Sequence, residues 1–236
     1  MVLGTCYRLG VKSDVQQPPD IRPSVPDRLY PQVVGAAWAT LAPAVQRVHT
    51  DPGVTRAEGT ARVSRAPGRL LGMVLDAARV PRSSSASPVQ LAIWHCGAAE
   101  QWHRNFDGRP LVTHQSVAPG GLLAERIGVL EFRFRLLAQD GALVFRQESL
   151  ALRVGMLRCP IPARSALVIA AREAAIPGAD DAELRTCVDV RMTLPTGALL
   201  FAYRGTVRWQ ASRSPNPSPV CARGEQLSRT TGRGLP

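Results

Sequence analysis

The chain lacks a long apolar run, closely paired cysteines and, almost entirely, lysine. No stretch approaches the ~18–20 apolar residues that a membrane-spanning helix needs. The N-terminal residues also lack the continuous apolar stretch of a secretory signal. These absences predict a soluble, cytoplasmic protein without a transmembrane segment.

The five cysteines are scattered along the chain and never form a C-x-x-C pair. They are Cys6, Cys96, Cys159, Cys187 and Cys221. A disulfide framework or a structural zinc site normally shows closer, paired spacing. We therefore interpret these residues as reduced thiols that pack as small apolar side chains.

The net charge of +11 suggests nucleic-acid binding, because Lys and Arg neutralise phosphates. However, Lys12 is the single lysine among 29 basic residues, and alanine is abundant. This bias indicates the base composition of the genome rather than selection for binding phosphates. The charge is also dispersed. Residues 29–210 hold 21 basic and 14 acidic side chains, and the last 26 residues hold four arginines against Glu225. We therefore expect no nucleic-acid partner.

Composition divides the chain into three parts. Residues 1–28 are polar and rich in proline, which predicts a loose N-terminal leader. Residues 211–236 have no periodicity and few large apolar groups, so they cannot offset the entropy of ordering and are predicted to be a disordered tail. Residues 29–210 are predicted to form a single domain.

The first part of this domain carries helical signals. Apolar residues recur at helical spacing in 29–49, where Pro43 predicts a break between two short helices. Residues 59–66 are predicted to be a short strand and 68–80 a second amphipathic helix. The serine-rich segment 82–88 is predicted to be a flexible linker or loop.

From Val89 onward the hydrophobic period changes to two. Apolar and polar residues alternate in 130–136, 188–194 and 201–209, which is typical of strands with one buried face. Asp107-Gly108 and Asp140-Gly141 are typical of tight hairpin turns. We predict an α+β fold, with a strongly curved antiparallel sheet or barrel of seven to nine strands packed with two or three helices.

Candidate catalytic and metal-binding groups are present, but no motif combines them. The possible metal ligands are His95, Cys96, Glu100, His103 and His114. Because adjacent strand residues point to opposite faces, His95 and Cys96 do not suit one metal ion, and we expect no metal site. The chain has no G-x-S-x-G motif, and 119–124 matches no glycine-rich nucleotide motif, so we expect no cofactor.

The carboxylates that could serve acid–base catalysis are Glu100, Asp107, Glu125, Glu131, Glu148, Glu173 and Asp189. Asp107 is assigned to a turn, and cross-strand ion pairs on the outer face explain Glu131 and Asp189. The outward arginines Arg133, Arg135, Arg191, Arg204 and Arg208 form a basic stripe if their strands are neighbours. This stripe could meet phosphates or anionic lipid, although a solvated sheet face is the simpler interpretation.

Six segments, taken in order, resemble the bacterial domain-of-unknown-function family 4166 over about residues 29–209. They are 29–49, 59–75, 100–109, 122–146, 160–174 and 188–209. The matching positions are Trp38, His49, Trp102, Arg104, Phe106, Gly108, Glu125, Arg126, Gly128, Pro160, Pro162, Tyr203, Arg204 and Gly205. The family's helix before the proline-ended loop is longer than 68–80, its strand after Asp107-Gly108 is richer in Phe than 111–115, and the tail after Trp209 matches nothing in it.

The resemblance implies a domain of unassigned activity, without an established catalytic residue. The family occurs alone or fused behind dehydrogenase-like nucleotide-binding domains, so it also implies an alternative function as an accessory or interaction domain beside an oxidoreductase.

The curved sheet suggests that the domain binds a small apolar or amphipathic ligand without enzymatic activity, because such sheets commonly enclose a cavity. The candidate pocket residues are Trp94, Trp102, Arg104, Phe132, Phe134, Tyr203 and Trp209. Arg104 would act as an inward polar handle for an anionic head group. A filled core explains the same residues, and an enzyme whose site the sequence does not reveal stays open as a third function.

Overall fold

Alternating apolar and polar residues form eleven strands, which hydrogen-bond side by side in one antiparallel sheet. The computed structural model describes residues 28–51, 54–77, 80–96, 98–176 and 184–211. The strands are β1 (Val54–Arg65), β2 (Ser84–Cys96), β3 (Ala99–Phe106), β4 (Arg109–Ala118), β5 (Leu122–Ile127), β6 (Leu130–Gln139), β7 (Ala142–Val154), β8 (Leu157–Ile161), β9 (Val168–Ala175), β10 (Arg185–Thr193) and β11 (Leu199–Ala211). The predicted leader and tail lie outside the described residues, apart from Arg28 and Ala211.

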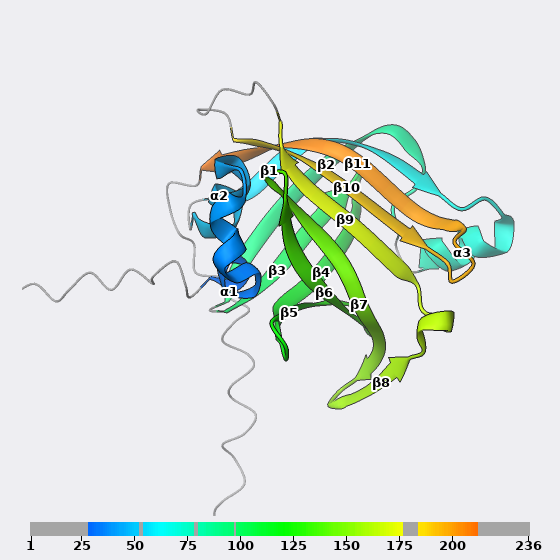
Figure 1. Cartoon of the computed structure of the whole chain (residues 1–236). Coiled ribbons are helices and arrows are strands. Elements are labelled where there is room, and N and C mark those ends of the chain that lie inside the picture. The colour runs from blue at the N-terminus through cyan, green and yellow to red at the C-terminus, as the bar shows by residue number, and fades with distance from the viewer. Residues whose placement is uncertain (1–27, 52–53, 78–79, 97, 177–183, 212–236) are drawn as a thin grey trace, which may run out of the picture.

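The sheet closes into a barrel because β6 also pairs with β7 (Figure 1). Ten strands follow one another around the ring in the order β6-β5-β4-β3-β2-β1-β11-β10-β9-β7, and β8 pairs with β7 outside the ring. The predicted barrel class is confirmed, but the predicted number of seven to nine strands was too low. The strands missed, β5, β8 and β9, are short or rich in alanine, so their sequences alternate weakly.

All the described helices except the short η3 lie within the two segments, 29–49 and 68–80, that were predicted to be helical, apart from one terminal residue, Thr50. They are α1 (Leu29–Val34), the 3₁₀ helix η2 (Gly35–Thr40), α2 (Pro43–Thr50), α3 (Arg69–Ala77) and the 3₁₀ helix η3 (Ala163–Ser165). The predicted break at Pro43 is confirmed, and this proline begins α2 at a position where no backbone N–H is needed. None of the described helices combines the length and the apolar character required to cross a membrane.

The predicted loop at 82–88 is wrong for most of its length. Strand β2 begins at Ser84, and its first residues pair with β1 through Ser84–Val63 and Ser87–Ala61. Serine and proline have a weak preference for strands, but pairing with β1 supplies backbone partners that override this preference.

Both predicted hairpin turns are present. Asp107-Gly108 joins β3 to β4, and Asp140-Gly141 joins β6 to β7. All four residues have positive φ, between 49° and 81°, as expected for two-residue turns that follow the twist of the strands.

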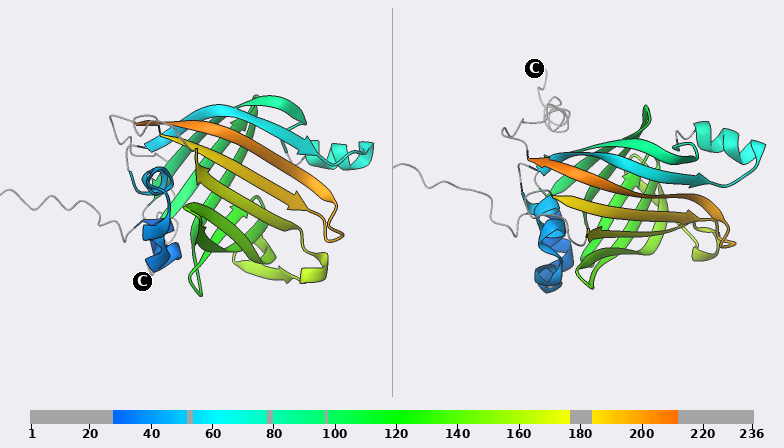
Figure 2. Two further views of the ribbon diagram at one scale, coloured as in Figure 1. Left: turned by 45° about the horizontal axis from the view of Figure 1, so that its top comes forward. Right: turned by 90° about the horizontal axis from the view of Figure 1, so that it is seen from above.

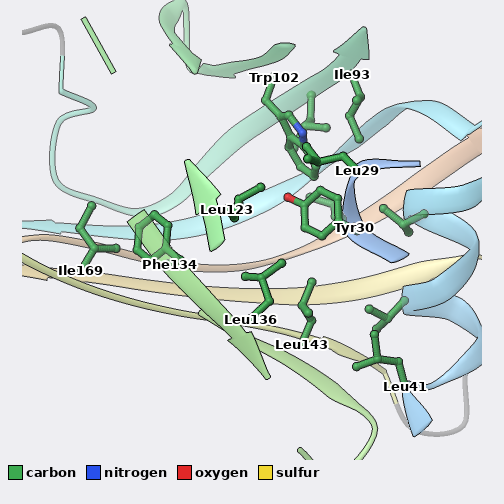
Figure 3. Packing of buried hydrophobic residues seen from close by; sticks show 14 of the residues in the cluster. Leu29, Tyr30, Leu41, Ile93, Trp102, Leu123, Phe134, Leu136, Leu143 and Ile169 are labelled. Carbon is green, nitrogen blue, oxygen red and sulfur yellow. The ribbon is translucent and has the colours of Figure 1, made fainter. Parts of the chain in front are cut away.

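The two ends of the barrel differ. Helices α1 and α2 cover one end, and α3, which connects β1 to β2, lies at the other (Figures 1 and 2). At the covered end, Leu29, Tyr30, Val45 and Val48 are almost completely buried. Figure 3 shows Leu29 and Tyr30 entering the barrel from α1 beside Trp102 of the wall. The N-terminal helices therefore close one end of the barrel with an apolar plug.

The predicted basic stripe is divided into two parts. Arg133 and Arg135 lie on β6, whereas Arg191, Arg204 and Arg208 lie on β10 and β11, and β7 and β9 separate the two groups. Four of the five arginines also face carboxylates on the outer surface. These pairs are Arg133–Glu131, Arg135–Glu148, Arg204–Asp189 and Arg208–Glu58, with distances of 3.0–3.8 Å.

Two glycines allow β1 and β11 to approach closely. A Cβ atom at Gly59 would overlap the carbonyl oxygen of Thr206, and a Cβ atom at Gly205 would lie 2.7 Å from that of Ala61. A side chain at either position would push the two paired strands apart. The tight curvature of the barrel wall therefore depends on glycine here.

We predict that Gly59→Ala lowers the free energy of unfolding by about 1–3 kcal/mol. The new methyl group would overlap the backbone of Thr206, which cannot move without disturbing the pairing of β11 with β1. The matched control is Gly72→Ala in α3, where an added Cβ contacts nothing within 4 Å. This control should raise stability by up to about 1 kcal/mol, because alanine favours helix over glycine. Urea unfolding of both variants is the measurement, and equal stabilities would contradict the role of Gly59.

Glu131 on β6 is buried on the outer face beneath three arginines. Its carboxylate accepts hydrogen bonds from Arg153 at 2.6 Å, Arg158 at 2.8 Å and Arg133 at 3.1 Å. Burial alone would raise the pKa of Glu131, but the three hydrogen bonds lower this pKa from 4.5 to about 2. These pairs connect β6, β7 and the outer strand β8, so the ionised carboxylate supports the attachment of β8.

Glu131→Gln should lower the free energy of unfolding by about 1–3 kcal/mol near pH 7, because a buried charged hydrogen-bond acceptor is lost. The folded-state pKa of Glu131 is depressed, so its contribution is present above pH 4.5 and is lost as the pH falls towards about 2. The stability difference between wild type and variant should therefore shrink over this window. Glu148→Gln is the control, because Glu148 makes its arginine pairs in a more exposed position and should change stability by less than about 1 kcal/mol.

Candidate functional site

The barrel encloses a cavity of about 630 Å³. Its lining comes from all ten strands of the ring, from Tyr30 of α1 and from Leu71 and Leu75 of α3. Six of the seven candidate pocket residues contribute to this lining, namely Trp102, Arg104, Phe132, Phe134, Tyr203 and Trp209. The barrel interior is therefore only partly filled by its own side chains.

Trp94 does not line the cavity, which corrects its predicted inward position. In the register of β2 with β3, Ile93 pairs with Trp102, so these two side chains share the inner face. Trp94 is next to Ile93 and points to the opposite face, where its ring lies 4.0 Å from that of His103. The sequence around Trp94 is apolar on both faces, so alternation did not settle which side is inside.

Polar side chains gather on the inner wall. We call Tyr30, Arg104, Thr113, Gln115, Glu125 and Glu173 the polar layer; all six line the cavity. The Tyr30 hydroxyl donates a hydrogen bond of 2.8 Å to Gln115, and Arg104 donates one of 3.0 Å to Thr113. Tyr30, Thr113 and Gln115 were absent from the predicted site. The spacing of Leu111, Thr113 and Gln115 in β4 is a sequence signal that places these three β4 residues on one face.

Arg104 is the cation of the polar layer. One of its guanidinium nitrogens lies 3.7 Å from Glu125, and its Cζ lies 4.9 Å from the centre of the Trp102 ring. Its side chain is only 12% exposed. Arg104 lines the cavity, and its charge is already balanced by the carboxylate of Glu125.

A second polar pair connects the plug to the wall. His49 of α2 is completely buried, and its Nε2 lies 3.0 Å from Oε2 of Glu173 on β9. The His49 ring also stacks on Tyr30, with ring centres 3.7 Å apart. The contact between His49 and Glu173 joins residues 124 positions apart and fixes α2 on the barrel.

A family model described as "Domain of unknown function (DUF4166)" matches residues 41–207. The chain belongs to this family. Five of the residues that carry the resemblance in sequence, His49, Trp102, Arg104, Glu125 and Tyr203, come together at the covered end and the inner wall of the barrel. The DUF4166 match therefore spans all the residues that line the cavity except Tyr30 and Trp209.

Two solved structures have distant similarity to this DUF4166 chain. Rv2717c from M. tuberculosis is 15% identical, with 72% of this chain and 99% of that chain covered and a TM-score of 0.38. A candidate thioesterase II from Thermobifida fusca is 9% identical, with 66% and 78% covered and a TM-score of 0.20. Similarity at this level carries no functional conclusion. A search of curated proteins found no match.

The titratable groups proposed for metal binding or catalysis are divided between the two faces of the sheet. His95 and Glu100 face each other across β2 and β3, 3.3 Å apart, and Glu100 accepts a hydrogen bond of 2.9 Å from Trp102. His103 lies on the opposite face against Trp94, and the side chain of Cys96 lies outside the described residues. The predicted cross-strand ion pairs of Glu131 and Asp189 are confirmed.

The polar layer changes the acidity of the two tyrosines that face it. Burial raises the pKa of Tyr203 above its ordinary value, Arg104 lowers it, and Glu125 raises it again. Burial raises the pKa of Tyr30 well above 10.0, and the charge of Glu100 raises it further. Both tyrosines therefore stay protonated over a wide pH range and can donate hydrogen bonds.

We predict that Tyr30→Phe lowers the free energy of unfolding by about 1 kcal/mol near pH 7, because the hydrogen bond to Gln115 is lost. Above pH 10 the unfolded wild type gains stability by ionising Tyr30, whereas the folded protein keeps it protonated. The wild type should therefore lose stability there faster than the variant, and the difference should shrink. Urea unfolding from neutral to alkaline pH measures this, and a constant difference would argue against a raised pKa of Tyr30.

Proposed function

We propose that the barrel binds one small amphipathic molecule, whose apolar part fills the cavity and whose polar group meets the polar layer. The observation that carries this proposal is the cavity of about 630 Å³ inside a closed barrel. Ligand sites commonly have volumes of about 300–1,000 Å³ and combine an apolar lining with a few placed polar groups. An ordinary protein core leaves no void of this size.

The residue types that line the cavity support ligand binding rather than covalent catalysis. Leucine, isoleucine, valine and phenylalanine side chains form most of the lining, and among the described residues no serine, cysteine or histidine lines the cavity. Nucleophilic catalysis of the common kind needs such a nucleophile beside a base. The features present serve instead to bury an apolar chain and to orient one polar end.

The polar end of the ligand is proposed to be uncharged. Arg104 already has Glu125 as its counter-ion, and Glu173 adds a second carboxylate to the layer. A carboxylate ligand would place a third negative charge in a buried site, which is costly. A hydroxyl or amide group could donate to a carboxylate and accept from Arg104, and Oε1 of Glu173 has no hydrogen-bond partner among the described residues. This modifies the expectation, drawn from the sequence, of an anionic head group.

Binding can be tested with decanol, decanoate and decylamine, which share a chain and differ in charge. Decanol should raise the melting temperature and change tryptophan fluorescence, because Trp102 and Trp209 line the cavity. We expect its affinity to exceed that of decanoate by about tenfold, because decanoate would add a third negative charge to the buried polar layer. Tighter binding of decylamine than of decanol would contradict an uncharged polar end. Native mass spectrometry of the purified protein should show a copurifying molecule of the same class.

Two variants locate the ligand. Val190→Phe fills cavity space and should abolish binding, whereas Val112→Phe, between two inward residues of β4, adds the same volume outside the cavity and should not. The double variant Arg104→Gln/Glu125→Gln keeps the charge balance and should weaken decanol binding about fivefold to tenfold, the effect of one hydrogen bond. If none of the three compounds binds and no molecule copurifies, the proposal fails.

A further inference from the structure

Exposed apolar side chains gather at the end of the barrel opposite the plug. Eight large apolar residues are exposed among the described residues, and only Val117 lies near the covered end. We call the other seven the mouth rim: Met73, Val129, Leu152, Val154, Met156, Leu157 and Val168. They belong to α3, to the β5–β6 turn, to the β7–β8 hairpin and to the start of β9. An exposed apolar patch of this kind commonly marks an interaction surface.

The most exposed part of the mouth rim is the tip of the β7–β8 hairpin. Met156 is 94% exposed and Leu157 is 72% exposed, and Gly155 forms the turn with a φ of 58°. Strand β8 pairs with β7 and lies outside the ring, so the hairpin projects beyond the barrel wall (Figure 1). The tip can therefore contact a surface without any change in the barrel.

Arginines surround these apolar residues. Six arginines lie in or beside the described connections at this end, and the acidic side chains there are Asp76, Asp107 and Glu131; the arginines are Arg65, Arg69, Arg82, Arg109, Arg158 and Arg164. Asp76 alone faces three of them, Arg65 and Arg109 within 3.0 Å and Arg82 at 3.4 Å. On the other side of the mouth, Glu131 likewise faces three arginines. Each cluster therefore keeps an excess positive charge.

We propose that the mouth rim docks on an anionic lipid bilayer and lets the ligand pass between the bilayer and the cavity. Projecting apolar side chains insert at the boundary between the lipid head groups and the acyl chains, while arginines beside them bind anionic head groups. Leu71 and Leu75 of α3 line the cavity while Met73 of the same helix is exposed, so the rim is continuous with the cavity wall. This inference rests on the proposed function, because it identifies where the amphipathic ligand comes from.

The first experiment is cosedimentation of the whole chain with vesicles. Vesicles of equal parts phosphatidylcholine and phosphatidylglycerol should bind the protein, and vesicles of phosphatidylcholine alone should bind it at least tenfold more weakly. Added salt should weaken the binding, because it screens the arginines. Equal binding to both vesicle types, or no binding to either, overturns the proposal.

Matched variants test the rim itself. Met156→Asp/Leu157→Asp should reduce vesicle binding by at least tenfold, whereas Val117→Asp, an exposed apolar residue near the other end, should leave it unchanged. Arg69→Glu/Arg164→Glu should also reduce it about tenfold or more, and Arg56→Glu at the start of β1 should not. Unchanged binding by both rim variants overturns the proposal.

The same variants separate docking from ligand binding. Without vesicles, the rim variants should bind decanol as the wild type does, whereas Val190→Phe should lose decanol but still bind vesicles. Loss of decanol binding in the wild type with vesicle binding intact would remove only the proposed function. Size-exclusion chromatography completes the test: if Met156→Asp/Leu157→Asp converts a dimer into a monomer, the rim is an interface between copies of the chain and the docking proposal is wrong.

Discussion

The pairing of β6 with β7 is the constraint on which the rest of the structure depends. Without these hydrogen bonds the eleven strands would form an open sheet with no inside, and the alternating residues would cover two exposed faces. With these hydrogen bonds, the inward side chains face a space enclosed by a ring of ten strands. Eight strands leave an interior that side chains just fill or that holds one small ligand, so ten leave more than side chains can occupy. The cavity is therefore a consequence of strand number as much as of residue choice.

The N-terminal helices determine how this surplus space is divided. Tyr30, Val45, Val48 and His49 enter one end and fill it with a packed plug, and the remaining space opens towards α3. The plug also carries polar atoms into the interior, where they pair with the wall through Tyr30–Gln115 and His49–Glu173. Buried polar groups cost free energy unless they are hydrogen-bonded, so these pairs stabilise the plug in one orientation. The floor of the cavity is thus made by segments that are far apart in the chain.

Local patterns predicted much of the fold and less of the site. Alternation located β6, β10 and β11 and the inward faces of Phe132 and Phe134, and Asp-Gly pairs located two hairpins. The start of β2 was missed because its partner β1, rather than its serines, makes it a strand. Trp94 was misplaced because a shift of one residue reverses the face of a strand. The contacts of Tyr30 and His49 join residues 85 and 124 positions apart, and no periodicity in the sequence encodes such a register.

Apolar side chains are buried at one end of the barrel and exposed at the other. At the covered end, Leu29 and Val48 are buried because two helices bring apolar faces to the opening. At the other end, α3 places Leu71 and Leu75 against the cavity but leaves the hairpin tip and the β5–β6 turn uncovered. Exposed apolar side chains lose the free energy that burial would supply, about 25 cal/mol for each Å². A chain that buries apolar residues efficiently at one end and exposes them beside arginines at the other has a surface suited to an apolar, anionic partner rather than to water alone.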